Sequence, residues 1–167
     1  MIRWLFLLWV FLVFRIQAQE FNFLEDPFSG IRGDSIVEKK IFELANRERK
    51  KAGLSALTYD THLQSAARQH SQDMLKQNYF SHFAPAEELK NPADRVYRTG
   101  LCDVVVGENI AVHSLEGSPD QIAEKLMDQW MTSAGHRANI LRPEFTDLGV
   151  GVVSAKDSTV TDTLIQG

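Results

Sequence analysis

The chain has 167 residues, with 18 basic and 22 acidic side chains and a net charge of −4. This acidic balance, together with the lack of a basic cluster in the sequence, excludes nucleic acid as an expected partner. A single cysteine, Cys102, excludes an internal disulfide. We therefore expect side-chain packing to hold the fold together and Cys102 to be a small buried hydrophobic residue.

The first 18 residues have the three parts of a secretory signal peptide. Arg3 supplies a positive start, residues 4–14 are an unbroken apolar run, and Ala18 is a small residue at the cleavage position. An uncleaved membrane anchor is the alternative, but this run is much shorter than the roughly 20 residues of a spanning helix. We expect residues 1–18 to be removed, which takes the net charge from −4 to −6 by loss of Arg3 and Arg15. The mature chain is then expected to be secreted or periplasmic, monomeric and without a membrane-spanning segment.

The mature chain is predicted to begin with an irregular arm and to continue as one domain. Residues 19–34 contain Pro27, Gly30 and Gly33 without a sustained hydrophobic period, which is typical of an arm that follows no regular structure. Residues 35–167 are of ordinary size for a single domain. Its first helix is predicted to start at Ser35, which forms a capping box with the Glu three residues further on, and to stop before Gly53.

Three more helices are predicted from residues that cap helix starts and from glycines that end helices. Their predicted ranges run from Asp60 to Gln77, from Asn91-Pro92 to Gly100, and from Ser118-Pro119 to Gly135.

Strands are few and come late in the chain. Residues 101–106 are rich in β-formers up to a break at Gly107, and residues 148–154 and 159–165 form two further runs around a turn. Because helices outnumber strands and do not alternate with them, the sequence predicts an α+β fold.

The histidines are the main candidates for chemistry, because the sequence lacks the common phosphate-loop, Cys-x-x-Cys, zinc-peptidase and Gly-x-Ser-x-Gly motifs. His82 and His136 fall near helix ends, and Glu108 falls at the break after the first strand, where we expect loops. Two imidazoles and a carboxylate suit a divalent cation or acid–base chemistry, but their spacing alone defines no motif. His70 lies on the apolar stripe of its helix, so we expect a hydrogen-bonded core residue.

Several collinear motifs together are specific to a family. They are Asn46-x-x-Arg49, His70-Ser71-x-Asp73-Met74, Ser81-His82, Arg95, Gly107-Glu108-Asn109-Ile110, Trp130-x-x-Ser133-x-Gly135-His136-Arg137-x-Asn139-Ile140-Leu141 and Gly149-Val150-Gly151. From the first helix to the last strand this series resembles the CAP superfamily of cysteine-rich secretory, antigen 5 and pathogenesis-related 1 proteins, also called the SCP domain. The segment around His136 and the scarcity of cysteine resemble the bacterial branch.

The resemblance implies an α–β–α sandwich, with a small antiparallel sheet between helical layers and a cleft lined by two histidines and two acidic residues. His82, His136 and Glu108 match three of these four positions. Where eukaryotic members commonly carry a Glu, three residues after the helix tryptophan, this chain has Ser133. Asn109 is the remaining cleft candidate, and we expect it to fix the turn that presents Glu108 rather than to contact a ligand.

Other matched residues are expected to be structural. Trp130 is expected in the core, and Arg49 and Arg95 are expected to tie helices to loops through charge-assisted hydrogen bonds. Gly149 and Gly151 are two apart on a strand and so share a face, where another backbone is expected to approach closely.

The favoured interpretation is a secreted binding module whose cleft takes a divalent cation such as Zn²⁺ through His82, His136 and Glu108, or a lipid-like or protein ligand, with no organic cofactor. A metal-dependent hydrolase or peptidase with Glu108 as general base stays open, as does a structural envelope component. The binding module is favoured because the second acid is missing and no nucleophile is evident. Ser133 could be proposed as one, but a serine at a helix end usually caps the helix.

Overall fold

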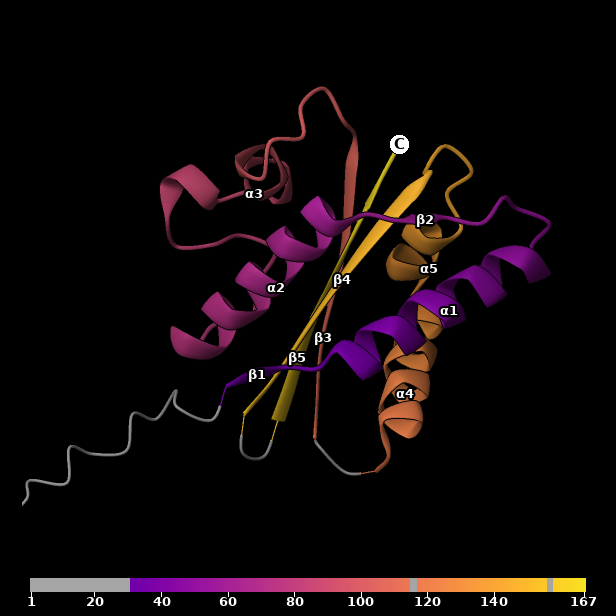
Figure 1. The fold of residues 1–167 in the computed structure, drawn as a ribbon, viewed down its shortest axis with the longest axis horizontal. Helices are drawn as coiled ribbons and strands as arrows, with labels where there is room; N and C mark the ends of the chain where they lie inside the picture. The colour runs from indigo at the N-terminus through magenta and orange to yellow at the C-terminus, as the bar shows by residue number, and fades with distance from the viewer. Residues whose placement is uncertain (1–30, 115–116, 156–157) are drawn as a thin grey trace, which may run out of the picture.

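The computed structural model describes residues 31–114, 117–155 and 158–167, so the predicted signal peptide and most of the predicted arm lie outside it. Within these ranges the chain forms five α-helices, a short 3₁₀ turn and a five-stranded sheet (Figure 1). The helices are α1 (Ser35–Lys51), α2 (Thr61–Lys76), α3 (Pro92–Arg98), α4 (Pro119–Thr132) and α5 (Ala134–Ile140), and the 3₁₀ turn is η1 (Glu87–Leu89). The strands are β1 (Arg32–Gly33), β2 (Thr58–Tyr59), β3 (Val106–Ser114), β4 (Asp147–Ala155) and β5 (Ser158–Gln166).

The sheet lies between two helical layers. Its strand order is β1-β4-β5-β3 with antiparallel neighbours, and the short β2 pairs with β4 in parallel. Figure 1 shows α2 and α3 on one side of the sheet and α1, α4 and α5 on the other. The predicted α+β fold, an α–β–α sandwich around a small and mainly antiparallel sheet, is therefore confirmed.

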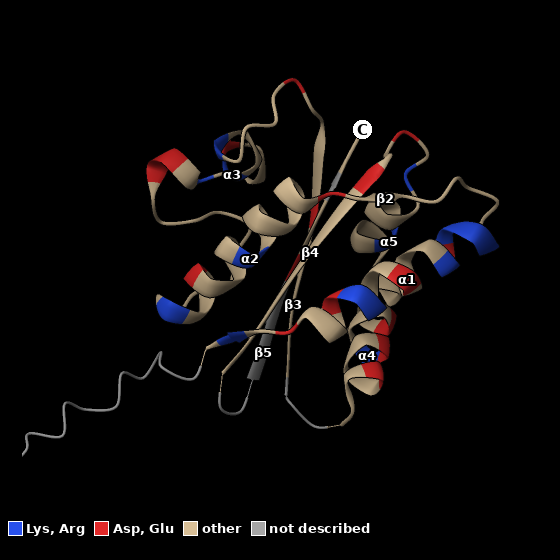
Figure 2. Cartoon of the chain, in the orientation of Figure 1, with Lys and Arg blue, Asp and Glu red and all other residues tan. Residues whose placement is uncertain are grey.

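The larger hydrophobic core fills the layer between the sheet and helices α1, α4 and α5. Trp130 is buried in it as predicted, and its indole Nε1 donates to the carbonyl of Ile110 at 3.2 Å. Arg49 is fully buried and donates to four backbone carbonyls, which ties α1 to the segments that precede β2 and β4. Figure 2 shows charged residues along the length of α1, and the basic ones of its last turn stabilise the helix dipole.

On the opposite face, α2 packs directly against β4. A Cβ atom at Gly149 would overlap the backbone of Leu63 and Gln64, and one at Gly151 would overlap that of Ala67 and Arg68. The predicted close approach of another backbone at these two glycines is therefore confirmed. The glycines bring α2 near enough for its side chains to reach the groups on β3 and β5.

The first helix starts with a different cap from the one predicted. Asp34, not Ser35, is the N-cap, and its carboxylate accepts from the amides of Ile36 and Val37. Glu38 was expected to complete a capping box. Instead it is buried against β4, where it accepts from the amide of Val152 at 3.0 Å and forms an ion pair with Arg68 of α2 at 2.5 Å. The other predicted helix starts are confirmed at Asp60, Asn91 and Ser118.

The strand predicted over residues 101–106 is wrong in position. The strand β3 begins at Val106 and continues through Gly107, which is not a break. The aromatic ring of Phe145 lies against Gly107, so a Cβ atom at this position would displace the ring. Cys102 consequently lies before the strand and is exposed, against the prediction that it is buried.

Two further differences come from short elements. The predicted end of a helix at Gly135 is wrong, since α4 ends at Thr132 and α5 begins at Ala134, with the extended backbone of Ser133 between them. Arg32 and Gly33, inside the predicted irregular arm, pair with β4 as β1. None of the helices in the described residues has both the length and the apolar character that crossing a bilayer requires.

Candidate functional site

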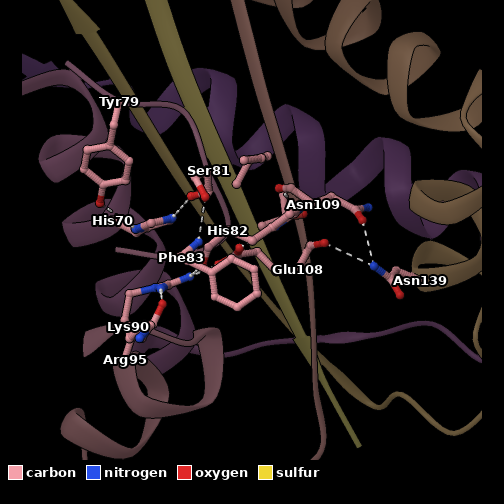
Figure 3. A network of polar contacts seen from close by, with 12 residues as sticks. His70, Tyr79, Ser81, His82, Phe83, Lys90, Arg95, Glu108, Asn109 and Asn139 are labelled. Carbon is pink, nitrogen blue, oxygen red and sulfur yellow. Dashed lines mark hydrogen bonds and ion pairs between the residues drawn. The ribbon is translucent and has the colours of Figure 1, made fainter. Parts of the chain in front are cut away.

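Glu108 stands at the centre of a buried polar network on the α2 side of the sheet (Figure 3). It lies in β3 opposite Leu164, in a strand rather than in the expected loop. Its Oε1 lies 2.7 Å from Nδ1 of His82, and its Oε2 accepts from Arg95. An ionised carboxylate only accepts hydrogen bonds, so Nδ1 of His82 carries the proton and Nε2 keeps its lone pair when the ring is neutral.

The loop that carries His82 is fixed by two buried side chains. Nε2 of His70 lies 3.0 Å from the carbonyl of Ser81, and Nη2 of Arg95 donates to the carbonyl of His82 at 3.2 Å. Nη1 of Arg95 donates to two further carbonyls just before α3. Arg95 thus ties a helix to a loop as predicted, and it also neutralises Glu108. His70 is the hydrogen-bonded core histidine that was predicted.

Helix α5 is attached to β3 beside Glu108 by two asparagines. Asn109 donates to the carbonyl of His136 at 3.1 Å, and Asn139 donates both to Asn109 Oδ1 at 3.0 Å and to the carbonyl of Glu108 at 3.1 Å. Asn109 is completely buried, and it lies in a strand rather than the predicted turn. Its amide is occupied by these contacts, so its role here is to position His136.

The pKa values of the two histidines of the predicted site are shifted in opposite directions. The hydrogen bond to Glu108 raises the pKa of His82, whereas burial and the nearby charge of His82 lower the pKa of His136. Nδ1 of His136 is buried without a hydrogen-bond partner among the described residues. The structure thus brings His82 and Glu108 into contact and places His136 within electrostatic reach of His82.

Ser133 links α4 to α5 as a shared cap residue. Its backbone amide donates to the carbonyl of Trp130, and its carbonyl accepts from the amide of Arg137. Within the described part of the chain, its hydroxyl makes no hydrogen bond to His82, Glu108 or His136.

A second acidic group, next to Glu108, was not predicted from the sequence. Asp162, in β5 opposite Ile110 and Gly151, is completely buried. Ligand atoms of His70, Glu108 and Asp162 all lie within 4.8 Å of one another, which makes them a possible metal-binding group. The available sequence signal was an acidic residue in the middle of a predicted strand.

The contacts within this group favour a proton over a metal ion. Both ring nitrogens of His70 face partners, Ser81 and Tyr79, and both oxygens of Glu108 accept hydrogen bonds. The carboxyl oxygens of Asp162 have no partner among the described residues. Burial, and then the charge of Glu108, raise the pKa of Asp162 well above its ordinary value, which favours a neutral carboxylic acid.

The fold and the positions of His82, Glu108 and His136 define a member of the SCP-domain class of proteins. The model of the CAP family, described as the cysteine-rich secretory protein family, matches residues 42–165. The chain therefore belongs to the CAP family.

Relatives from bacilli are 36–42% identical to this chain over the matched residues. The Bacillus subtilis (strain 168) protein YkwD is 42% identical over 121 residues, which cover 72% of this chain and 44% of YkwD. The membrane protein YlbC of the same organism is 36% identical over 115 residues, 69% of this chain and 31% of YlbC. A crystal structure of an extracellular protein containing an SCP domain from Bacillus anthracis is 36% identical with a TM-score of 0.64, and the match covers 77% of this chain and 40% of that one. This chain thus spans less than half the length of each of these relatives.

The fold extends to more distant proteins. The structure of NaASP2 with Zn²⁺ has a TM-score of 0.60 at 16% identity, over 82% of this chain and 81% of that one. At this identity the likeness concerns the fold alone.

Proposed function

We propose that this protein is a secreted binding module in which His82 and His136 hold a divalent cation such as Zn²⁺, with Glu108 orienting His82. The observation that carries the proposal is the contact of 2.7 Å between His82 Nδ1 and Glu108 Oε1. Histidines that bind metals usually donate their second ring N–H to a carboxylate, which fixes the tautomer and leaves the other nitrogen free for the ion. His82 has this arrangement, with Nε2 as the free nitrogen.

The second histidine fits the same role. His136 has a lowered pKa, so it is neutral near pH 7, as a metal ligand must be. Its Nδ1 has no partner among the described residues, and its position on α5 is fixed by Asn109. The sequence also predicts Glu108 as a metal ligand. In that role, one of its carboxylate oxygens would have to give up its contact with His82 or with Arg95 and bind the ion instead. Solvent or the bound ligand completes the coordination, as in sites that keep an open position.

The contacts of Glu108 favour binding over catalysis. A general base needs an oxygen that is free to accept a proton from water, and both oxygens of Glu108 already accept from Arg95 and His82. The second candidate, a metal-dependent hydrolase or peptidase, rests on the same residues with Glu108 as general base. The ligand of the binding module is proposed to be lipid-like or a protein, bound by a monomer that uses no organic cofactor.

Replacement of Glu108 by Gln separates the two functions. In the binding module, loss of the carboxylate partner of His82 should weaken Zn²⁺ affinity by about 10- to 100-fold, and there is no turnover to lose. In a hydrolase, the variant should retain much of its metal and lose its peptidase or esterase activity. The test is metal analysis of purified parent and Glu108→Gln protein together with activity assays on both. Zinc-dependent turnover by the parent that is absent from the variant would support the hydrolase and contradict the binding module.

The proposed secretion is supported by the signal-like N-terminus and by the extracellular relative from Bacillus anthracis. The proposed cation is supported by the distant relative NaASP2, whose structure was solved with Zn²⁺. Extraction of the purified protein with organic solvent, followed by mass spectrometry, tests for a lipid-like ligand.

A further inference from the structure

A pocket of about 620 Å³ lies between α2 and α3, on the flank of the molecule next to the His82–Glu108 network. This volume is within the range of sites that hold small molecules. Neither His82, Glu108 nor His136 lines it. Arg95 lies between the pocket and the His82–Glu108 network, because its guanidinium contacts Glu108 and its side chain also lines the pocket. The pocket is thus a distinct candidate site.

The two charged groups of the pocket, Arg95 and Arg98, are both basic. Arg95, Arg98 and His62 line it, and none of its lining residues is acidic. The chain as a whole carries a net charge of −4, so a pocket with only basic ionisable groups departs from the character of the molecule.

One of these groups, Arg98, has free capacity for a ligand. Arg98 makes no hydrogen bond or ion pair with another residue in the described part of the chain. Arg95 is 3% exposed, and its Nε–H is buried without an acceptor among the described residues. Because this N–H has no exposed surface, it is not in reach of a ligand in the pocket. An anion bound here would supply acceptors for Arg98.

The uncharged lining points to a ligand rich in hydroxyl groups. Ser65, Thr61 and Thr99 contribute hydroxyls and Gln69 contributes an amide, whereas Ala66 and Leu89 are the apolar members. A pocket for an acyl chain would be mainly apolar. His62 Nδ1 lies 2.7 Å from the carbonyl of Thr99, so Nδ1 carries the proton and Nε2 remains available to a hydroxyl.

We propose that the pocket between α2 and α3 binds a small hydroxylated organic anion, of the class of sugar acids and sugar phosphates. Arg98 contacts the carboxylate or phosphate group, and the hydroxyl and amide side chains of α2 contact the sugar hydroxyls. Planar guanidinium groups bind both kinds of anion through paired N–H donors. The site is independent of the proposed cation site, because it uses neither His82 nor His136.

The test is a titration of ¹⁵N-labelled protein by NMR, without added metal, with four probes: glucuronate, glucose 6-phosphate, glucose and inorganic phosphate. We expect saturable shifts in α2 and α3 with glucuronate or glucose 6-phosphate, and the stronger of the two identifies the anionic group. We expect weaker binding of glucose, which lacks the charge, and of inorganic phosphate, which lacks the hydroxyl-bearing ring. Equal binding of either control, or no saturable shift with either sugar anion, would overturn the proposal.

Two variants check the location of the site. Arg98→Gln should weaken binding at least about tenfold, which corresponds to about 1.4 kcal/mol. Arg47→Gln, which removes another exposed charge, on α1, should leave the affinity unchanged. Ser65→Leu, at an exposed position of α2, should block the pocket without unfolding the helix. Parent-like affinity in Arg98→Gln and Ser65→Leu would show that the anion binds elsewhere and would contradict the proposal.

Discussion

Arg95 of α3 and Glu108 of β3 form an ion pair whose side chains are 3% and 2% exposed. The pair joins a short helix to the sheet, and through the carbonyl of His82 it also fixes the loop between α2 and α3. Charges buried this deeply are tolerated only when their partners are present.

Removal of the Arg95 guanidinium should therefore destabilise the fold. Arg95→Met is expected to lower the free energy of unfolding by about 3–5 kcal/mol, because it leaves Glu108 charged and buried without its partner. Urea denaturation followed by circular dichroism measures the change. Arg98→Met, three residues further along the same helix and exposed, should change stability by less than about 0.5 kcal/mol. A similar small effect for Arg95→Met would mean that the ion pair is not needed for folding.

The contact between His82 and Glu108 has a consequence for pH. Because the hydrogen bond raises the pKa of His82 in the folded state above the ordinary 6.5, it stabilises the fold fully below that value. This contribution is lost as the pH rises through the raised pKa. NMR titration of the ring protons should show His82 titrating above His136, whose pKa is lowered. Glu108→Gln should lower the pKa of His82, and an unchanged titration in this variant would rule out the contact in solution.

Ionisation of Asp162 should destabilise the fold, whereas ionisation of most acidic residues stabilises it. Its raised pKa means that the folded chain keeps a proton which the unfolded chain releases near pH 3.8, so stability falls as the pH rises through the folded pKa. Asp162→Asn keeps the shape and removes the titration. Its melting temperature should exceed that of the parent by more at about pH 8 than at about pH 4. Asp128→Asn on the exposed face of α4 is the control. An equal pH response in the two variants would show that the pKa of Asp162 is not raised.

The predicted signal peptide is tested on exported protein. Intact mass spectrometry of the protein from the medium or periplasm should give an N-terminus at Gln19 or within a few residues of it, because Ala18 fits the cleavage position. Recovery of a membrane-bound chain that still carries residues 1–14 would favour the uncleaved anchor.

Sequence patterns predicted those features that depend on neighbouring residues. Asp60, Asn91 and Ser118 were identified as helix caps because a cap interacts with amides only two or three positions away. Gly149 and Gly151 were identified because their spacing places them on one strand face.

Features that depend on distant contacts were missed. The start of β3 is set by its pairing with β5 and by Phe145 against Gly107, neither of which is visible in the local sequence. The burial of Glu38 depends on Arg68, and the burial of Asp162 depends on the packing of α2. His82 and Glu108 are 26 residues apart, and they were placed together only through the resemblance to a family.

Calorimetric titration with Zn²⁺ tests the proposed cation site most directly. The parent should bind the ion, with an affinity that falls as the pH drops through the raised pKa of His82 and falls further through the lowered pKa of His136, because both imidazoles must lose their protons. His82→Ala and His136→Ala should each remove most of the binding, whereas His62→Ala, at an exposed histidine of α2, should bind as the parent does. Parent-like affinity in His82→Ala and His136→Ala would contradict the shared site.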